Sequence, residues 1–191
     1  MKMEKTITVY CGSSSELPPV FLESASALGR TIAAAGATLV TGAGRTGMMG
    51  AVADAALAAG GRVRGIIPQF MVDRGWHHSG LSELVVTADM HERKSLMAQS
   101  TACVALPGGI GTFEELCEII TWRQLGLFSG NVVIYNVEDY YGPMLSMFAT
   151  AIEKGFMRPD HLGLFKVSSS AAETVEMALA APDRKTFTPK F

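Results

Sequence analysis

The sequence lacks the features from which a membrane protein or a nucleic-acid-binding protein is built. No apolar run approaches the roughly 18 residues that a membrane-spanning helix requires, and Met1–Lys5 leads into a strand pattern without an apolar signal core. The 16 Lys and Arg residues are balanced by 18 Asp and Glu residues, for a formal net charge of -2. Nucleic acid and anionic membranes therefore have no electrostatic reason to bind. We expect a cytoplasmic protein that holds a small molecule at a local site.

Cysteine is also scarce, which bears on disulfides and metal sites. Cys11, Cys103 and Cys117 form no CxxC pair, and each lies in an apolar stretch. This pattern predicts three buried free thiols, a state that suits a reducing cytoplasm. Hydrophobic residues make up 48% of the 191 residues and charged residues 18%, a balance typical of a folded globular chain.

Short β-rich runs alternate with helical stretches along the chain. Most runs are continuously apolar, as strands are when helices cover both faces of a parallel sheet. The expected strands are Thr6–Cys11, Ala37–Thr41, Val63–Ile67, Leu84–Thr87, Ala102–Leu106, Asn131–Asn136 and Leu164–Val167. The expected helices lie near residues 19–35, 47–59, 90–101, 112–126, 141–154 and 170–181. This order predicts one Rossmann-like α/β domain over residues 1–191, doubly wound around a mostly parallel sheet of about seven strands, with a mobile tail at 182–191.

The junction after the fifth expected strand is rich in glycine. Pro107 is followed by Gly108–Thr112, which contains three glycines, and the next helix carries Glu114, Glu115 and Glu118. Glycine lets the backbone approach a ligand closely, and the free N–H groups at a helix start favour an anion such as phosphate. The glutamates either compensate the helix dipole in its first turns or belong to a site that uses carboxylates.

A second glycine loop follows the second expected strand. Gly42, Gly44 and Gly47 fit the pattern GxGxxG, but a dinucleotide site would also need an acidic residue about 20 positions further on. Residues 55–72 contain no Asp or Glu. Arg62 and Arg64 leave an NADP site open, while a second phosphate-facing loop that includes Gly44, or a tight strand-to-helix turn, fits the pattern better.

Two adjacent cations, Arg93 and Lys94, are expected near the start of a helix, where they oppose its dipole at a cost of about 0.3–1 kcal/mol each. Either an anionic ligand compensates this cost or both side chains extend into solvent. His91 and Glu92 begin a pattern like the zinc motif HExxH, but position 95 is Ser95. No metal site is predicted, because no other cluster of ligands is present.

Polar residues occupy two further loops. Ser13–Ser15 follow the first strand and either donate hydrogen bonds to phosphate or cap the next helix. His77 and His78 precede the fourth strand, where loop histidines are usually structural or solvent-facing, although they can also form a lid over a pocket.

These motifs together resemble a known family. Residues 107–115 fit the pattern PGGxGTxxE, and residues 90–94 fit the companion pattern MHxRK. In this combination the chain is similar to the Lonely Guy family of cytokinin riboside 5′-monophosphate phosphoribohydrolases, often mislabelled lysine decarboxylases. The likeness extends to the opening residues 10–14 and to the run 118–126.

The resemblance implies specific roles. Its catalytic pair corresponds to Arg93 and Glu115. The phosphate loop corresponds to Gly108, Gly109, Ile110, Gly111 and Thr112, and the nucleotide site would also include Lys94, Glu114 and Thr121. Ser13 and Gly44 are candidate binding residues from the two other junctions. The resemblance further implies hydrolysis of a purine nucleoside 5′-monophosphate, no cofactor, and at least a dimer with its site near the subunit interface.

Two departures from the family pattern leave the preferred base open. The second loop has Arg45, which adds a charge, and residues 73–78 contain no counterpart of the glutamate that contacts substrate in many members. Two other functions also stay open: a decarboxylase that carries pyridoxal phosphate on a lysine, and a nucleotide-binding or carrier protein without catalysis. An apolar stripe at Met144, Met147, Phe148 and Ile152 indicates either core or a subunit contact.

Overall fold

The computed structural model describes residues 4–182, and the predicted tail lies outside this range except for Pro182. Seven strands form one sheet in the order β4-β3-β2-β1-β5-β6-β7, and every pairing is parallel. The strands are β1 Thr6–Tyr10, β2 Thr38–Thr41, β3 Val63–Pro68, β4 Glu83–Thr87, β5 Ala102–Ala105, β6 Asn131–Tyr135 and β7 Lys166–Ser168. The prediction of a doubly wound α/β fold is therefore confirmed.

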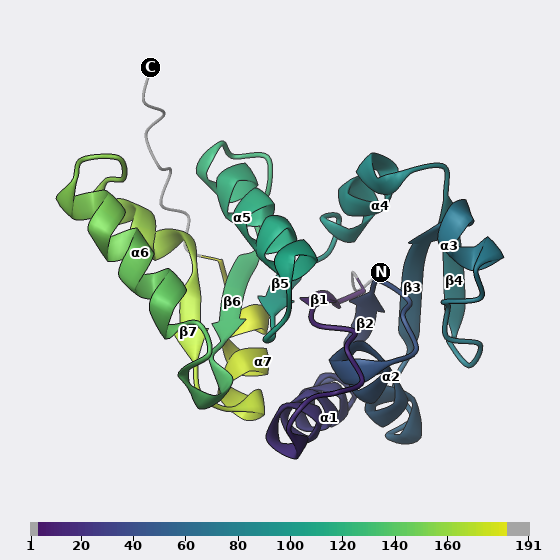
Figure 1. Cartoon of the computed structure of the whole chain (residues 1–191). Helices are drawn as coiled ribbons and strands as arrows, with labels where there is room; N and C mark the ends of the chain where they lie inside the picture. The colour runs from purple at the N-terminus through teal and green to yellow at the C-terminus, as the bar shows by residue number, and fades with distance from the viewer. Residues whose placement is uncertain (1–3, 183–191) are drawn as a thin grey trace.

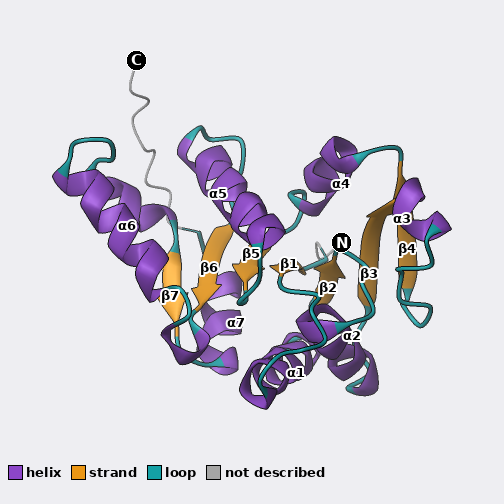
Figure 2. Ribbon diagram, in the orientation of Figure 1, coloured by secondary structure: helices purple, strands orange, loops and turns teal. Residues whose placement is uncertain are grey.

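Helices cover both faces of this sheet. Figures 1 and 2 show α1, α2 and α7 on one face and α4, α5 and α6 on the other, with the short α3 beside β4 at the edge. The helices are α1 Pro19–Ala34, α2 Gly47–Ala58, α3 Gln69–Asp73, α4 Met90–Met97, α5 Ile110–Gln124, α6 Gly142–Glu153 and α7 Ala171–Leu179, with 3-10 turns at Val137–Asp139 and Pro159–Leu164. No helix within residues 4–182 is both long and apolar enough to cross a bilayer.

The central strands are apolar because both of their faces are covered. All residues of β1, β2, β5 and β6 are buried. Alternate residues of β1 enter different cores: Ile7 and Val9 pack with α1, α2 and α7, whereas Tyr10 packs under α5. The edge strand β4 alternates in exposure instead, as expected for a strand with only one well-covered face.

Three local expectations are wrong. The fourth helix ends at Met97, and not near 101, because Thr8 of β1 donates a hydrogen bond to the Met97 carbonyl (2.7 Å). The helix α5 begins at Ile110, two residues before Thr112, since Gly109 already serves as its N-cap. Cys117 is exposed, whereas Cys11 and Cys103 are buried as predicted. Cys117 lies on the outer side of α5, between the exposed residues Glu114 and Thr121.

The topology places a crevice at the carboxyl ends of β1 and β5. The chain builds β1 to β4 in one direction across the sheet and then returns to place β5 on the other side of β1. Loops that leave β1 and β5 therefore diverge to opposite faces, and ligands of doubly wound sheets bind at such a point. The glycine loop after β5 and the serine loop after β1 meet here, since the Gly12 N–H donates to the Pro107 carbonyl (3.0 Å).

Candidate functional site

The glycine loop after β5 is packed tightly on one side and open on the other. A Cβ atom at Gly108 would lie 2.8 Å from the Gly12 nitrogen and would overlap the Thr112 hydroxyl. In contrast, Cβ atoms at Gly109 and Gly111 would have no atom within 4 Å. Gly108 is therefore required by internal packing, while Gly109 and Gly111 leave space where a ligand can approach the backbone.

The open side of the loop is the start of α5. Gly109 is the N-cap and Ile110 the first helical residue, with a side chain that is 82% exposed. The first N–H groups of a helix have no carbonyl partner within it, and they carry the positive end of the helix dipole. Because α5 begins at Ile110, its first turn contains no acidic residue. Dipole compensation in the first turn therefore does not explain Glu114 or Glu115.

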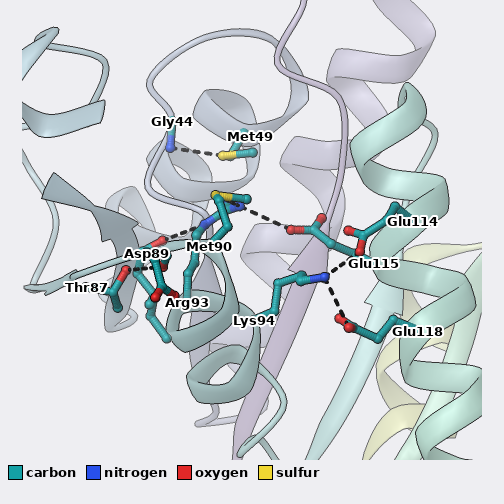
Figure 3. Close-up of polar contacts among 11 residues, drawn as sticks. Gly44, Met49, Thr87, Asp89, Met90, Arg93, Lys94, Glu114, Glu115 and Glu118 are labelled. Atoms are coloured by element: carbon teal, nitrogen blue, oxygen red, sulfur yellow. Dashed lines mark hydrogen bonds and ion pairs between the residues drawn. The ribbon is translucent and has the colours of Figure 1, made fainter. Parts of the chain in front are cut away.

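Arg93 of α4 and Glu115 of α5 are brought together by the packing of the two helices' side chains. The Arg93 Nη1 atom lies 3.4 Å from Glu115 Oε1, and its Nε donates to the Ile66 carbonyl (3.1 Å). Figure 3 shows the two side chains pointing toward each other. A side chain at Gly42 would overlap the Arg93 guanidinium, so this glycine lets the arginine lie against the β2 loop. Arg93 does not extend into solvent: only 7% of the residue is exposed.

Glu115 carries an unusual carboxyl group. Burial raises its pKa to about 7, while the nearby positive charge of Arg93 acts in the opposite direction. Its side chain is 11% exposed. A carboxyl group with a pKa near neutrality beside a charged partner is typical of functional sites.

Lys94 has protein partners of its own. Its ammonium pairs with Glu114 and, at 3.1 Å, with Glu118 (Figure 3). The hydrogen bond that Lys94 donates to Glu114 is the main cause of a raised Lys94 pKa, and Glu118 adds to it. Because α4 is short, Lys94 lies in its last turn, where a cation suits the helix dipole. The carboxylates of α5 compensate the charges of the two cations.

The second glycine loop is held against the serine loop. Gly47 has a φ of 61°, and a side chain there would collide with the Ser14 backbone. The Thr46 hydroxyl donates to the Ser13 carbonyl (2.7 Å), and the Gly44 N–H lies 2.9 Å from the Met49 sulfur (Figure 3). The loop is thus a tight strand-to-helix turn in this structure, whose Gly44 N–H already has a partner.

The histidine loop is anchored to the same turn. His78 donates its backbone N–H to the Ala43 carbonyl (2.8 Å), and its Nε2 lies 2.8 Å from Asp54 Oδ1. His77 forms an isolated bridge with Gly44. Both histidines therefore have structural contacts, and they fix the loop beside Arg45, with which they line a cavity of about 320 Å³.

A second cavity lies at the crevice itself. Its volume is about 440 Å³, and it is bounded by the serine loop, the glycine loop and the starts of α1 and α2, with these lining residues: Gly12, Ser13, Ser14, Leu17, Phe21, Met48, Pro107, Gly108, Gly109 and Tyr140. Ser13–Ser15 do not cap α1, which begins at Pro19 with no side-chain cap. Their side chains therefore do not serve the helix, and Ser13 lies on the cavity wall.

Some candidate residues lie apart from the rest, and others were missed. Thr121 is exposed, two helical turns beyond Glu114, and its hydroxyl donates to the Cys117 carbonyl of its own helix (2.8 Å). The sequence interpretation noted Glu118 but did not identify it as the second partner of Lys94, and it missed Tyr140, whose hydroxyl donates to the Gly108 carbonyl. The only sequence signal for Tyr140 is that it forms an aromatic pair with Tyr141 after β6. Among the described residues, no group of three His, Cys, Asp or Glu side chains is arranged to hold a metal ion.

This fold and site define a Rossmann-like α/β protein with a glycine loop and a buried carboxylate–guanidinium pair at the switch point of its sheet. The chain belongs to the family whose model is described as "Possible lysine decarboxylase", which matches residues 49–178, and whose members include the Lonely Guy phosphoribohydrolases. A cytokinin riboside 5′-monophosphate phosphoribohydrolase of Arabidopsis thaliana, LOG5, is 39% identical over 173 residues, 90% of this chain and 76% of the relative. The enzyme of that name from Rhodococcoides fascians is 44% identical over 158 residues, 81% of this chain and 79% of the relative.

Solved structures share the fold at lower identity. The molybdenum cofactor carrier protein of Chlamydomonas reinhardtii is 24% identical, with a TM-score of 0.70 over 93% of this chain and 99% of that chain. The molybdenum cofactor binding protein of Rippkaea orientalis is 21% identical, with a TM-score of 0.70 over 92% and 96%. These solved structures show that the fold is shared, whereas the sequence relatives show the family to which the chain belongs.

Proposed function

We propose that this protein hydrolyses the N-glycosidic bond of a purine nucleoside 5′-monophosphate, with a plain or a cytokinin-type adenine base. Water adds to C1′ as the bond from C1′ to the base nitrogen breaks. The base leaves with a proton, and ribose 5-phosphate retains the new hydroxyl group. The observation that carries this proposal is the nearly buried Glu115–Arg93 pair: Arg93 lies on α4, and Glu115 lies on α5, the helix that begins at the open side of the glycine loop.

In this proposal Glu115 acts on the ribose. Cleavage of the bond passes through an oxocarbenium-like ribose, so a carboxylate near C1′ stabilises the developing positive charge. Glu115 is one and a half helical turns beyond Ile110, the first residue of α5. In this proposal the phosphate of the nucleotide lies at the start of the helix and its sugar extends along the helix toward this carboxylate.

The remaining candidates hold the nucleotide. Gly108–Thr112 bind the 5′-phosphate through backbone N–H groups, and Ser13 approaches it across the cavity. Arg93 neutralises the phosphate or assists the departing base. Fixing the phosphate orients the ribose for attack, a gain that reaches several kcal/mol in well-aligned systems. Lys94, Glu114, Thr121 and Gly44 complete the nucleotide site, and Lys94 would exchange part of its pairing with Glu114 for a ligand contact.

A carrier function is the second candidate. It is favoured by the fold that this chain shares with the two molybdenum cofactor proteins. A protein that only binds has no need for a buried carboxyl group with a pKa near 7 beside the phosphate loop, which supports the hydrolase over the carrier.

The decarboxylase named by the family model needs a lysine that loses its proton to form a Schiff base with pyridoxal phosphate. Lys94 is the lysine of the site, and its pKa is raised by Glu114 and Glu118. Its ammonium is thereby stabilised, which is the opposite of what Schiff-base chemistry requires. An absorbance scan of the protein mixed with pyridoxal phosphate tests this: a Schiff-base band would favour the decarboxylase.

We also propose that the protein acts as a homodimer or higher oligomer in the cytoplasm, without nucleic acid or membrane partners. The outer face of α5, which starts at the glycine loop, supports this, because Ile110, Cys117 and Thr121 are exposed along it, as is Leu125 at its C-cap. A second copy that covers this face would enclose the nucleotide. Light scattering coupled to size-exclusion chromatography measures the mass, and a monomer at assay concentration would contradict the proposal.

The test of function is chromatography of the protein incubated with AMP and with isopentenyladenosine monophosphate. Release of free base and ribose 5-phosphate is expected from at least one of them, and the ratio of the two rates reports the preferred base. Saturable binding of both without release would contradict the hydrolase and favour the carrier.

A further inference from the structure

Three consecutive carbonyl groups of the glycine loop are each held by a donor from the protein. The Leu106 carbonyl accepts from the Tyr141 hydroxyl (2.8 Å), and the Pro107 carbonyl accepts from the Gly12 N–H (3.0 Å). The Gly108 carbonyl accepts from the Tyr140 hydroxyl. The last of these bonds differs from the others, because Tyr140 is partly exposed at the cavity and the peptide group that it holds joins two glycines.

A peptide group between two glycines can rotate as a unit more easily than any other, since neither neighbour restricts its dihedral angles. The peptide bond is planar and trans, so its C=O and N–H point in opposite directions. Fixing the Gly108 carbonyl toward Tyr140 therefore fixes the direction of the Gly109 N–H. Gly109 is the N-cap of α5, and its N–H precedes those of the first turn at the open side of the loop.

The Tyr140 hydroxyl also affects the strength of that donor. A hydrogen bond to the carbonyl of a peptide group polarises the N–H of the same group. An unheld Gly108 carbonyl turned toward the site would present a negative oxygen to a phosphate. The hydrogen bond from the Tyr140 hydroxyl holds the Gly108 carbonyl away from that orientation.

The position of Tyr140 is itself enforced at a conformational cost. Glu138 and Asp139, which precede it, both have positive φ values, 51° and 53°, and each such residue costs on the order of 1 kcal/mol. Asn136 stabilises this turn by donating to Asp139 Oδ1 (2.9 Å) and by accepting from the Tyr141 N–H (2.7 Å). Strain of this kind persists only where the surroundings determine the conformation.

Aromatic neighbours hold the Tyr140 ring as well. It stacks on Phe113 of α5 with ring centroids 6.2 Å apart and an interplanar angle of 20°. It meets Phe21 of α1 and Tyr141 edge to face, at 6.3 Å and 5.3 Å. The ring therefore bridges α1 and α5 across the cavity, and its hydroxyl is kept at the Gly108 carbonyl.

We propose that Tyr140 is a positioning residue for phosphate binding: its hydroxyl holds the Gly108–Gly109 peptide group in the orientation that presents the Gly109 N–H to the 5′-phosphate. This inference rests on the proposed function only in placing a phosphate at this loop. The proposal gives the turn after β6 a role in substrate recognition. This role is not evident from the sequence, because the turn is far from the glycine loop along the chain.

The structure provides a matched control. Tyr141→Phe also removes a hydroxyl that holds a carbonyl of this loop, but the Leu106–Pro107 peptide group has no N–H, because proline lacks one. Tyr140→Phe should weaken the affinity for AMP and for ribose 5-phosphate by about five- to tenfold, the typical effect of one lost hydrogen bond, and leave the affinity for adenosine unchanged. Tyr141→Phe should lower the melting temperature and leave the affinity for all three ligands unchanged.

Calorimetric titration of the three ligands, together with thermal melts, tests the positioning role of Tyr140. Wild-type affinity for AMP in Tyr140→Phe, or equal losses for AMP and adenosine, would overturn the positioning role alone. Binding of AMP by the unaltered protein without release of adenine would overturn the hydrolase and leave the role of Tyr140 intact. No saturable binding of AMP or ribose 5-phosphate would overturn both. In a turnover assay the KM for AMP should rise in Tyr140→Phe, with a smaller change in kcat.

Discussion

The guanidinium of Arg93 lies 3.4 Å from the carboxylate of Glu115, and the two side chains are only 8% and 11% exposed. A charge pair this deeply buried carries a large desolvation penalty, and removal of one partner leaves the other uncompensated. Strongly perturbed charged groups of this kind cluster at functional sites.

Glu115→Gln should abolish most of the turnover while it preserves folding and nucleotide binding. The amide keeps the shape and accepts the Arg93 hydrogen bond, but it cannot offset a developing positive charge on the ribose. We expect kcat to fall by about a hundredfold or more, measured as release of base from AMP. Glu118→Gln, on the same helix, is the matched control and should retain most of the activity. Near-normal turnover in Glu115→Gln would remove this residue from the mechanism.

Glu115 should also make stability depend on pH. Its pKa is about 7 in the folded protein, raised by burial from the ordinary value of 4.5. A raised pKa means that the folded state favours the protonated carboxyl group, so its contribution to stability is complete below about 4.5 and is lost as the pH rises through about 7. The loss is on the order of 3 kcal/mol.

Urea unfolding of the wild type and of Glu115→Gln at several pH values measures this contribution. Gln does not titrate, so the stability of the variant relative to the wild type should increase between pH 5 and pH 8. Parallel stability curves for the two proteins would show that the Glu115 pKa is not raised.

The glycines of the loop should separate into two groups. Gly108→Ala places a methyl group against Thr112 and the Gly12 nitrogen, and we expect a loss of about 1–3 kcal/mol in the free energy of unfolding. Gly109→Ala and Gly111→Ala meet open space, so stability should change by less than about 1 kcal/mol. AMP affinity should nevertheless fall by about tenfold or more in the latter two, because the phosphate loses access to the backbone donors. Unchanged AMP affinity in both would place the phosphate elsewhere.

Lys94 should link α4 to α5 through Glu118. Both side chains are partly buried, which makes their pairing stronger than that of an exposed pair. A double-mutant cycle with Lys94→Met and Glu118→Gln should give a coupling of about 0.5–1 kcal/mol in urea unfolding. A cycle with Glu114→Gln, whose side chain is 50% exposed, should give less. Equal coupling energies in the two cycles would show that burial does not strengthen the ion pair between Lys94 and Glu118.

The sequence alone was a good guide wherever the signal is local. Apolar runs, most of them continuous, identified the seven strands, since strands covered on both faces need apolar residues at successive positions. The glycines of 108–111 predict an anion loop for a similar reason, because the backbone of a few neighbouring residues determines its shape, and this role of the loop stays a prediction. The short helix α3 escaped notice, as five residues are too few for a helical period to show.

Signals that are not local needed the fold. The partners of Arg93 and Lys94 lie 20 to 24 residues away on another helix, and the sequence could suggest only solvent or a ligand for them. The end of α4 was misplaced for the same reason: Thr8, 89 residues earlier, binds its last carbonyl. Cys117 was expected in the core from its apolar neighbours, but its place on the turn of α5 directs it outward.

The sequence by itself thus determined the parallel α/β architecture and the family, and it predicts the position of a phosphate loop, because these depend on short-range periodicity and backbone geometry. The tertiary structure decided which charges meet, how deeply Glu115 is buried, and that Tyr140 holds the Gly108 carbonyl from 32 residues away. The order in which strands assemble in the sheet decides which loops become neighbours, and no local pattern encodes that order.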